Sequence, residues 1–226
     1  MRRALISIPA ALAALLLTPG ASLAAGGTSI ATAPTISYGA LEAGGGVEDE
    51  FWRMPVSAGD IVTFDIEEGT GGGIDFRLLS PSINDYTVHQ HNEDGLDPTG
   101  GKSQETWRSP FTGIGTLWVV NWRDGSGNLE NFTFIATLTH ATSLAISAPS
   151  LARRGSTITV HARVSSPAGT PEGACLISGE EATLSAGVCS KRVRLRNGTK
   201  QTIHVSFVPN DGWQAASSNR TIHLLR

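Results

Sequence analysis

The sequence lacks the motifs by which most hydrolases and nucleotide-binding enzymes are identified. It contains no GxSxG nucleophile elbow, no HExxH zinc motif and no glycine-rich loop that leads into a helix. The glycines at 71–73 precede a strand-like run, so they offer no helix N-terminus to a phosphate. The acidic residues include no pair that the pattern selects for glycosidic cleavage. We therefore expect a protein without a catalytic site.

After the first 24 residues the sequence also lacks a long apolar run and a helical stripe. Instead, apolar and polar residues alternate in short runs between turn signals, which is typical of β-sandwiches and barrels. The strand-like runs are 61–66, 74–79, 105–111, 116–122, 132–138, 156–164, 174–177, 188–195, 202–207 and 220–225. Residues 81–104 are polar and predict a long loop with a short strand near 86–89. The pattern predicts an all-β fold.

The first 24 residues are typical of a secretory signal peptide. Arg2 and Arg3 form a positive start, Ala4 to Leu17 is mostly apolar, and Ser22-Leu23-Ala24 offers small residues to a signal peptidase. At 1.5 Å per helical residue this apolar stretch is too short to cross about 30 Å of hydrocarbon. We predict cleavage after Ala24 and a secreted, extracellular protein with no membrane span.

Charge is divided unevenly along the chain. Residues 28–142 contain 16 acidic and 5 basic residues, whereas residues 143–226 contain 4 acidic and 10 basic residues. Such a division indicates two units with different surfaces. The linker Thr139 to Ser143 is short and not rich in glycine or serine, so the units are expected to abut. We predict an acidic β-sandwich domain over 28–142 and a basic one over 143–226.

Cysteine is scarce, and its two occurrences lie in the basic half. Cys175 and Cys189 are 14 positions apart. Two distant thiols supply too few ligands for a zinc site, and reactive thiol pairs usually sit closer together, as in CxxC. In an exported protein the simplest reading is one disulfide, which would stabilise the fold by about 3 kcal/mol for a loop of ~15 residues.

The acidic half contains FWRMPVSAGDIVTFDI, then GGIDFRLLSP, then GIGTLWVVNW and a closing NFTFIATL. Over residues 35–140 this order resembles the bacterial pre-peptidase C-terminal domain, in which an aGD turn precedes a dl.L..P strand and a G.y.v.V strand. The resemblance implies a secreted, jelly-roll-like sandwich. The long acidic stretch at 81–104 departs from the family's pattern.

The basic half contains RRGSTITVHARV, TPEGACLI and HVSFVPNDGWQAASSN. Over residues 144–226 these runs resemble the bacterial immunoglobulin-like repeat of surface proteins, matching its opening strand, its TPxGxVxF turn and its v.Y.gD..y..S.S ending. Phe207 stands in the place of the tyrosine and Trp213 in that of the later aromatic residue. The resemblance implies an immunoglobulin-like sandwich to which the cysteine pair is an addition.

Two acidic turns in the first half are candidates for a calcium site. Asn92, Asp94 and Asp97 place oxygen ligands around a glycine, and Asp124 opens a second turn. Calcium requires six to eight oxygen atoms around one point, and strands of alternating direction would bring both turns to one pole of the sandwich. The segment lacks the full DxDxDG spacing, so the alternative is a pair of surface turns without a ligand.

Four of the five tryptophans lie in the first half. Alternation places Trp118, Val120 and Trp122 on one face of a strand. Packing into the core is the more common fate of such a stripe. Alternatively, Trp107, Trp118 and Trp122 form an exposed surface on which sugar rings stack.

The second half contains the run Lys191-Arg192-Val193-Arg194-Leu195-Arg196. On a strand, Arg192, Arg194 and Arg196 share one face while the two apolar residues point into the core. A ladder of arginines could attract an acidic envelope polymer; nucleic acid is less favoured because no aromatic residues are interleaved for base stacking. A solvated charged face, or docking onto the acidic first half, is the alternative.

These features predict a secreted, non-catalytic protein of the binding or adhesion type. Its partner would be a polysaccharide or a protein at a cell surface, and no cofactor other than calcium is expected. A carbohydrate-binding module that uses the tryptophans of the first half is one alternative. The accessory domain pair of an extracellular hydrolase system is another.

Overall fold

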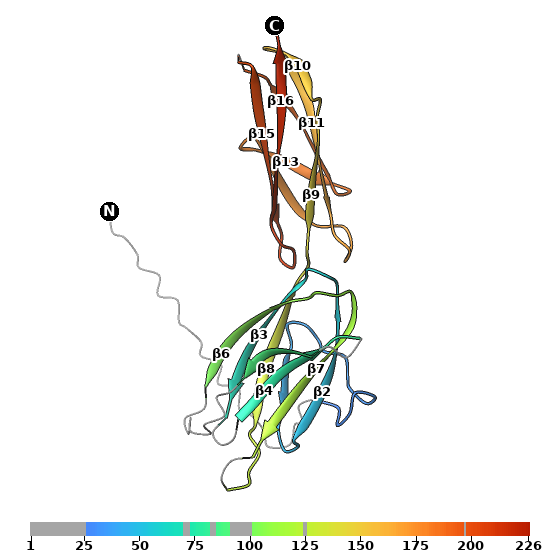
Figure 1. The fold of residues 1–226 in the computed structure, drawn as a ribbon, viewed down its shortest axis with the longest axis vertical. Helices are drawn as coiled ribbons and strands as arrows, with labels where there is room; N and C mark the ends of the chain where they lie inside the picture. The colour runs from blue at the N-terminus through green and yellow to red at the C-terminus, as the bar shows by residue number, and fades with distance from the viewer. Residues whose placement is uncertain (1–25, 70–72, 82–84, 91–100, 124–125, 197) are drawn as a thin grey trace, which may run out of the picture.

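The computed structural model describes residues 26–226 apart from 70–72, 82–84, 91–100, 124–125 and 197, with the backbone alone for 85–90. Within these residues the chain is all-β and contains no helix. The strands form two sandwiches arranged end to end, each around its own hydrophobic core (Figure 1). We call residues 26–139 the first sandwich and residues 143–226 the second. The predicted signal peptide lies outside the described residues.

No helix long and apolar enough to cross a membrane is found in the described part of the chain.

The first sandwich packs two four-stranded antiparallel sheets face to face. One sheet has the order β1-β8-β3-β6 and the other the order β2-β7-β4-β5. The strands are β1 (Leu41–Gly44), β2 (Asp49–Val56), β3 (Ile61–Glu68), β4 (Gly73–Leu79), β5 (Asp85–Gln90), β6 (Lys102–Arg108), β7 (Gly113–Trp122) and β8 (Phe132–Thr139). In the stretch 81–104, the short strand expected near 86–89 is present as β5, and the expected loop also contains the start of β6.

The core of the first sandwich is aromatic. Alternation along β2 turns Trp52 and Met54 inward with no exposed surface and leaves Arg53 outside. Phe134 on β8 lies within the cluster, and its ring centroid is 5.2 to 6.4 Å from those of Trp52, Phe64, Phe76 and Phe132. The contacts with Trp52 and Phe76 are edge-to-face, the arrangement that aromatic quadrupoles favour.

The residues before β1 cover the edge of β2. Gly27 and Phe51 exchange backbone hydrogen bonds in both directions. The neighbouring Glu50 is buried, and its carboxylate accepts hydrogen bonds from the backbone N–H groups of Gly26 at 3.0 Å and Gly45 at 2.6 Å. Burial raises the pKa of the Glu50 carboxyl, while the two N–H groups act in the opposite direction.

The second sandwich is one sheet of eight strands folded over on itself, in the order β10-β16-β15-β12-β13-β14-β11-β9. The strands are β9 (Ser143–Ser147), β10 (Leu151–Arg153), β11 (Thr157–Ser165), β12 (Gly173–Ile177), β13 (Glu180–Ser185), β14 (Val188–Arg194), β15 (Lys200–Pro209) and β16 (Ala216–Leu225). β13 passes between the layers, because its first residues pair with β12 and its last two pair with β14. β10 pairs with β16 in parallel.

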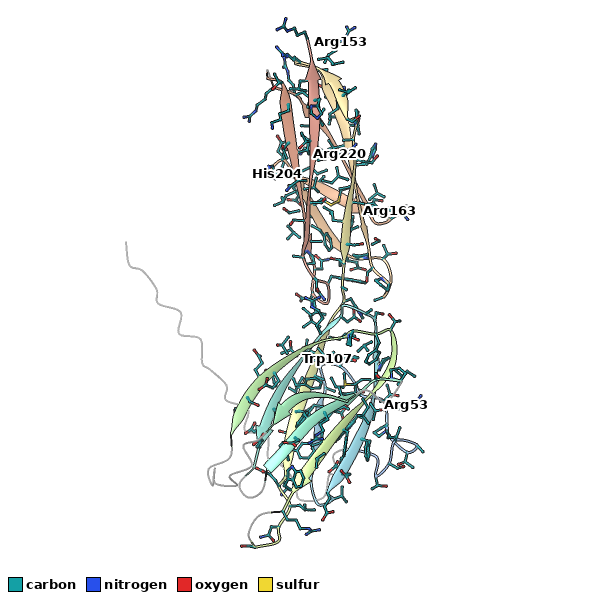
Figure 2. The ribbon with its side chains drawn as sticks, viewed as in Figure 1. Arg53, Trp107, Arg153, Arg163, His204 and Arg220 are labelled. Atoms are coloured by element: carbon teal, nitrogen blue, oxygen red, sulfur yellow. A yellow bond between two sulfur atoms is a disulfide. The ribbon has the colours of Figure 1, made fainter. Side chains whose placement is uncertain are left out.

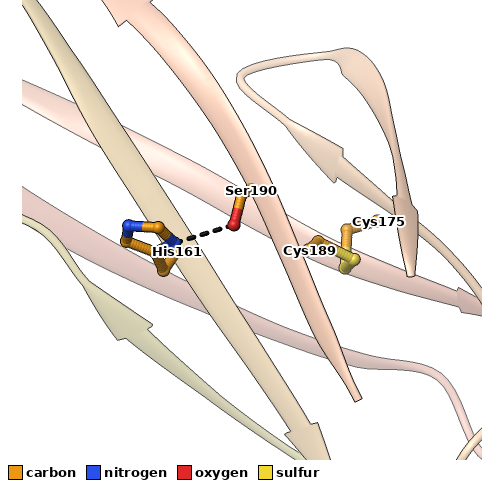
Figure 3. Close-up of a disulfide and its surroundings, with 4 residues drawn as sticks. All are labelled: His161, Cys175, Cys189 and Ser190. Carbon is orange, nitrogen blue, oxygen red and sulfur yellow. Dashed lines mark hydrogen bonds between the residues drawn. A yellow bond between two sulfur atoms is a disulfide. The ribbon is translucent and has the colours of Figure 1, made fainter. Parts of the chain in front are cut away.

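The core of the second sandwich is mainly aliphatic and contains a disulfide. Cys175 on β12 and Cys189 on β14 are fully buried and bonded, with their Cα atoms 6.2 Å apart (Figure 3). The predicted disulfide is therefore confirmed. Because β12 and β14 lie in opposite layers, the bond connects the two layers through the core.

The linker between β8 and β9 is hydrogen-bonded to both sandwiches. On the side of the second sandwich, the N–H of His140 donates to the carbonyl of Gly212 at 2.8 Å, and the N–H of Gln214 donates to the carbonyl of His140 at 2.9 Å. On the side of the first, the fully buried carboxylate of Asp60 accepts the N–H of Ala141 at 2.9 Å and lies 3.2 Å from His140 Nδ1. These bonds fix the linker at both of its ends.

Candidate functional site

β14 presents arginines to solvent, as the alternation of its sequence predicts. Arg192 and Arg194 are exposed, and Arg196 is exposed just beyond the end of the strand. Between them Val193 is half-buried, and Leu195 is buried in the second core. Inward-facing apolar residues therefore hold the strand in place while the arginines point away from the core.

The neighbouring strand β11 extends this face with polar residues. Thr159 lies opposite Arg192, and Thr157 lies opposite Arg194. Farther along β11, His161 Nδ1 is 2.7 Å from the hydroxyl of Ser190 on β14 (Figure 3). Arg163 is the next exposed residue of β11 after His161 (Figure 2). Arg163 was not among the predicted site residues, although the alternation in TITVHARVS places it on the same face.

The arginines of this surface, which we call the arginine face (Arg163, Arg192, Arg194 and Arg196), form no ion pair with any residue that the structure describes. Lys191, on the other side of β14, differs because its ammonium group is 2.9 Å from the carboxylate of Glu180. The hydrogen bond and charge of Lys191 lower the pKa of the Glu180 carboxyl. The cations of the arginine face are thus not compensated by carboxylates of the described chain.

A hollow of about 460 Å³ lies at one end of the arginine face. Gly155, Arg194, Leu195 and Arg196 line it. Two guanidinium groups beside one hollow can donate paired hydrogen bonds to a carboxylate, sulfate or phosphate group. The arrangement is therefore suited to an anionic group.

The three tryptophans expected to form a sugar-binding surface do not lie together. Trp107, on β6, is 9% exposed and belongs to the core of the first sandwich, where its ring centroid is 5.8 Å from that of Phe111. β6 belongs to one sheet, whereas β7, with Trp118 and Trp122, belongs to the other. The expectation of a single surface made by the three residues is wrong.

Trp118 points away from the core, but neighbours occupy both faces of its ring. The ring of Phe51 on β2 stacks on it with a centroid distance of 6.1 Å, and the guanidinium carbon of Arg77 on β4 is 5.4 Å from the ring centroid. β2 and β4 flank β7 on opposite sides, so these contacts cover opposite ring faces. The indole N–H donates to Asp49 Oδ1 at 2.7 Å. A sugar ring could not stack on Trp118 without displacing a neighbour.

Trp122 is 55% exposed, and the residue opposite it on β4 is Gly73, which has no side chain. The stripe of Trp118 and Trp122 therefore does not pack into the core, and the expectation that it would is wrong. The inward position next to Trp122 belongs to Asn121, which is 3% exposed. Its amide donates to the carbonyl of Glu130 at 2.6 Å and accepts the N–H of Glu130 at 3.0 Å, so this polar side chain is satisfied inside the core.

The calcium candidates Asn92, Asp94, Asp97 and Asp124 lie outside the described residues. β5 and β7 both run antiparallel to β4, so the chain leaves both strands at the same end of the first sandwich. This direction agrees with the expected common pole of the two acidic turns. The calcium site itself stays a prediction.

No family model matches the chain, and no curated protein matches it. One solved structure with a local similarity is a beta-glucuronidase of Bacteroides uniformis covalently bound to cyclophellitol-6-carboxylate aziridine; the identity is 11%, the match covers 78% of this chain and 26% of that chain, and the TM-score is 0.25. The chain thus spans about a quarter of that protein's length. A similarity at this TM-score does not indicate a shared fold or a shared function.

Proposed function

We propose that this chain is a secreted, non-catalytic binding protein whose second sandwich attaches to an acidic polysaccharide at a cell surface. The observation that carries the proposal is the arginine face, with Arg192, Arg194 and Arg196 in one row and without a carboxylate partner among the described residues. Positive charge that is not neutralised within the protein is available to a ligand.

The spacing of the arginines suits an extended polymer. Successive outward positions on a strand are about 7 Å apart, so a chain of anionic groups lying along β14 would meet several guanidinium groups in turn. Each exposed ion pair contributes little alone, but linked contacts reinforce one another. The hydroxyls of Thr157 and Thr159 lie beside the arginines and offer hydrogen bonds to sugar hydroxyls.

The side chains around the arginines favour a polysaccharide over a nucleic acid. Proteins that bind single strands usually stack bases on aromatic residues. The exposed positions of β11 that neighbour the row carry threonine, histidine, arginine and serine. No phenylalanine, tyrosine or tryptophan occurs in β11 or β14. Binding through charge and hydroxyl groups is the mode that this face supports.

Export is proposed from the leader-like first 24 residues together with the disulfide, since disulfides persist in oxidising compartments.

The strand order also supports the immunoglobulin-like assignment of the second half. β9, β11, β14 and β13 take the places of strands A, B, E and D, and β12, β15 and β16 those of C, F and G. Repeats of that kind occur in surface proteins, which agrees with an attachment role.

The test compares retention of the mature protein on immobilised polygalacturonate, an acidic polysaccharide, with retention on neutral dextran. The variant Arg192→Gln/Arg194→Gln should bind polygalacturonate about 30-fold more weakly, because each cation near an anionic surface contributes about 1 kcal/mol. The matched control is Arg220→Gln/Arg226→Gln, which removes the same charge from β16 and the residue after it. The control should retain most of the affinity.

Three results would reject the proposal. They are equal binding to polygalacturonate and dextran, equal loss in the two double variants, and binding to single-stranded DNA that exceeds binding to polygalacturonate at the same salt concentration. The last result would identify the face as a nucleic-acid site.

A further inference from the structure

A second hollow, of about 470 Å³, lies on the outer face of the β2-β7-β4 sheet in the first sandwich. Its floor crosses three strands, because Arg53 on β2, Thr116 on β7 and Leu79 on β4 lie next to one another in the sheet register. Ile30, from the turn before β1, lines one wall, and Ile114 lines the floor near the start of β7. None of these residues belongs to the arginine face.

The hollow is lined largely by apolar side chains that are open to solvent. Ile30 is 53% exposed and Ile114 is 47% exposed. Leu79 and Pro81 add further apolar surface. Exposed apolar groups that gather around one concave place are typical of ligand sites, and the volume falls within the range of small-molecule pockets.

Arg53 is unusual among the cations of the acidic half. In that half Arg77 pairs with Asp75, Lys102 with Glu67 and Arg123 with Glu48; Arg108 donates to the carbonyl of Gly59. These pairs leave Arg53 as a cation for which the described residues supply no side-chain partner, although 16 acidic residues lie in the same half of the sequence. Its exposed side chain lies at the side of the first sandwich (Figure 2) and lines the apolar hollow.

We propose that this hollow binds a small carboxylate with a compact apolar body, with the carboxylate on Arg53 and the apolar body against Ile30 and Ile114. A guanidinium group donates two parallel hydrogen bonds to a carboxylate, and the hydroxyl of Thr116 lies within the same hollow. The apolar walls exclude water from the rest of the ligand. A neutral ligand would gain the apolar contacts but not the paired hydrogen bonds.

The experiment is a titration of the ¹⁵N-labelled mature protein with 4-methylpentanoate and with octanoate, followed by amide chemical shifts. We expect saturable shifts at residues around the hollow with a Kd of about 1 mM for at least one of them, as ligands of this size allow. The neutral isostere 4-methylpentanamide should bind at least about tenfold more weakly. No saturable shift with either carboxylate would overturn the proposal.

Two variants separate the charge from the apolar wall. Arg53→Gln should reduce carboxylate binding to the level of the amide, and Ile114→Ser should weaken acid and amide alike. Both positions face outward, so the fold is retained. Arg123→Gln, which removes an arginine paired with Glu48 elsewhere in the same sandwich, is the control and should leave binding unchanged. Equal affinity for acid and amide, or an unaltered affinity in Arg53→Gln, would contradict the site.

Discussion

The two sandwiches stabilise their cores by different means. In the first, four large aromatic rings pack around that of Phe134, and no cysteine is present. In the second, buried valine, isoleucine and alanine side chains dominate, and the Cys175–Cys189 bond joins the layers. Small units bury a smaller share of their surface than large ones, so a unit with few large side chains gains from a covalent link.

The two sandwiches also use charge differently. In the acid-rich first sandwich, Arg77, Lys102 and Arg123 each pair with a carboxylate. In the second, the arginine face has no such partners among the described residues. Apart from Arg53, the cations of the first sandwich are therefore bound within the fold, while those on β14 are available to a ligand.

The largest expected effect concerns the aromatic core. Phe134→Ala should lower the free energy of unfolding of the first sandwich by about 4 kcal/mol, because the substitution removes a buried ring and leaves a cavity among its neighbours. Urea denaturation followed by tryptophan fluorescence measures the effect, since four of the five tryptophans lie in this half. The transition of the second sandwich should not move. A decrease in the free energy of unfolding of less than about 1 kcal/mol would show that the aromatic cluster contributes little to the stability of the first core.

The disulfide provides the matching test of the second sandwich. Cys175→Ala/Cys189→Ala should lower its free energy of unfolding by about 3 kcal/mol, as the loss of a cross-link across a short loop predicts. Hydrogen exchange of the core amides of β12 and β15 reports the change. If the amides of the first sandwich lost as much protection, the two cores would not be independent.

A smaller effect is expected from pH, through Glu50. Burial raises the pKa of its carboxyl above the ordinary value of 4.5, so the folded chain binds more protons here than the unfolded chain. The stability contributed by this group is therefore present at low pH and is lost as pH rises from about 4.5 to the folded pKa. Glu50→Gln should lack this decline, which urea denaturation over a series of pH values would measure. Parallel pH profiles for the two proteins would contradict the assignment.

The smallest effect is expected at Trp122. Because its side chain is 55% exposed, Trp122→Ala should change the free energy of unfolding by less than about 0.5 kcal/mol. Binding to polygalacturonate should not change either, since Trp122 lies in the first sandwich. If the substitution instead abolished retention on a neutral polysaccharide, the carbohydrate-binding alternative would replace the proposed function.

Alternation along the sequence predicted the fold class and most strands, but the runs it named leave out β1, β2, β9, β10 and β13. β10 has three residues, and β13 begins with Glu180 and Glu181, so neither shows a clear pattern. β6 was placed three residues too late. It has one buried side chain, Trp107, and ends before Pro110, which has no N–H for the ladder.

The sites show where pattern alone is insufficient. Periodicity placed Arg192 and Arg194 on one face correctly, because Val193 and Leu195 fix which side is inward. For β7 it could group Trp118 with Trp122 but could not choose the side, because the polar Asn121 is buried and makes hydrogen bonds with Glu130 that the pattern does not show. The hollow at Arg53 could not be predicted from the sequence, because the residues that line it come from three strands and a turn that are brought together only by folding.

The salt dependence of polygalacturonate binding tests the central claim most directly. Titrations of the wild type and of Arg192→Gln/Arg194→Gln over a range of sodium chloride concentrations give the slope of log affinity against log salt. If guanidinium groups displace counterions from the polymer, the wild type should show a steep negative slope. The slope of the double variant should be shallower than that of the wild type, by up to about two units. Equal slopes for the two proteins would contradict the account of the arginine face.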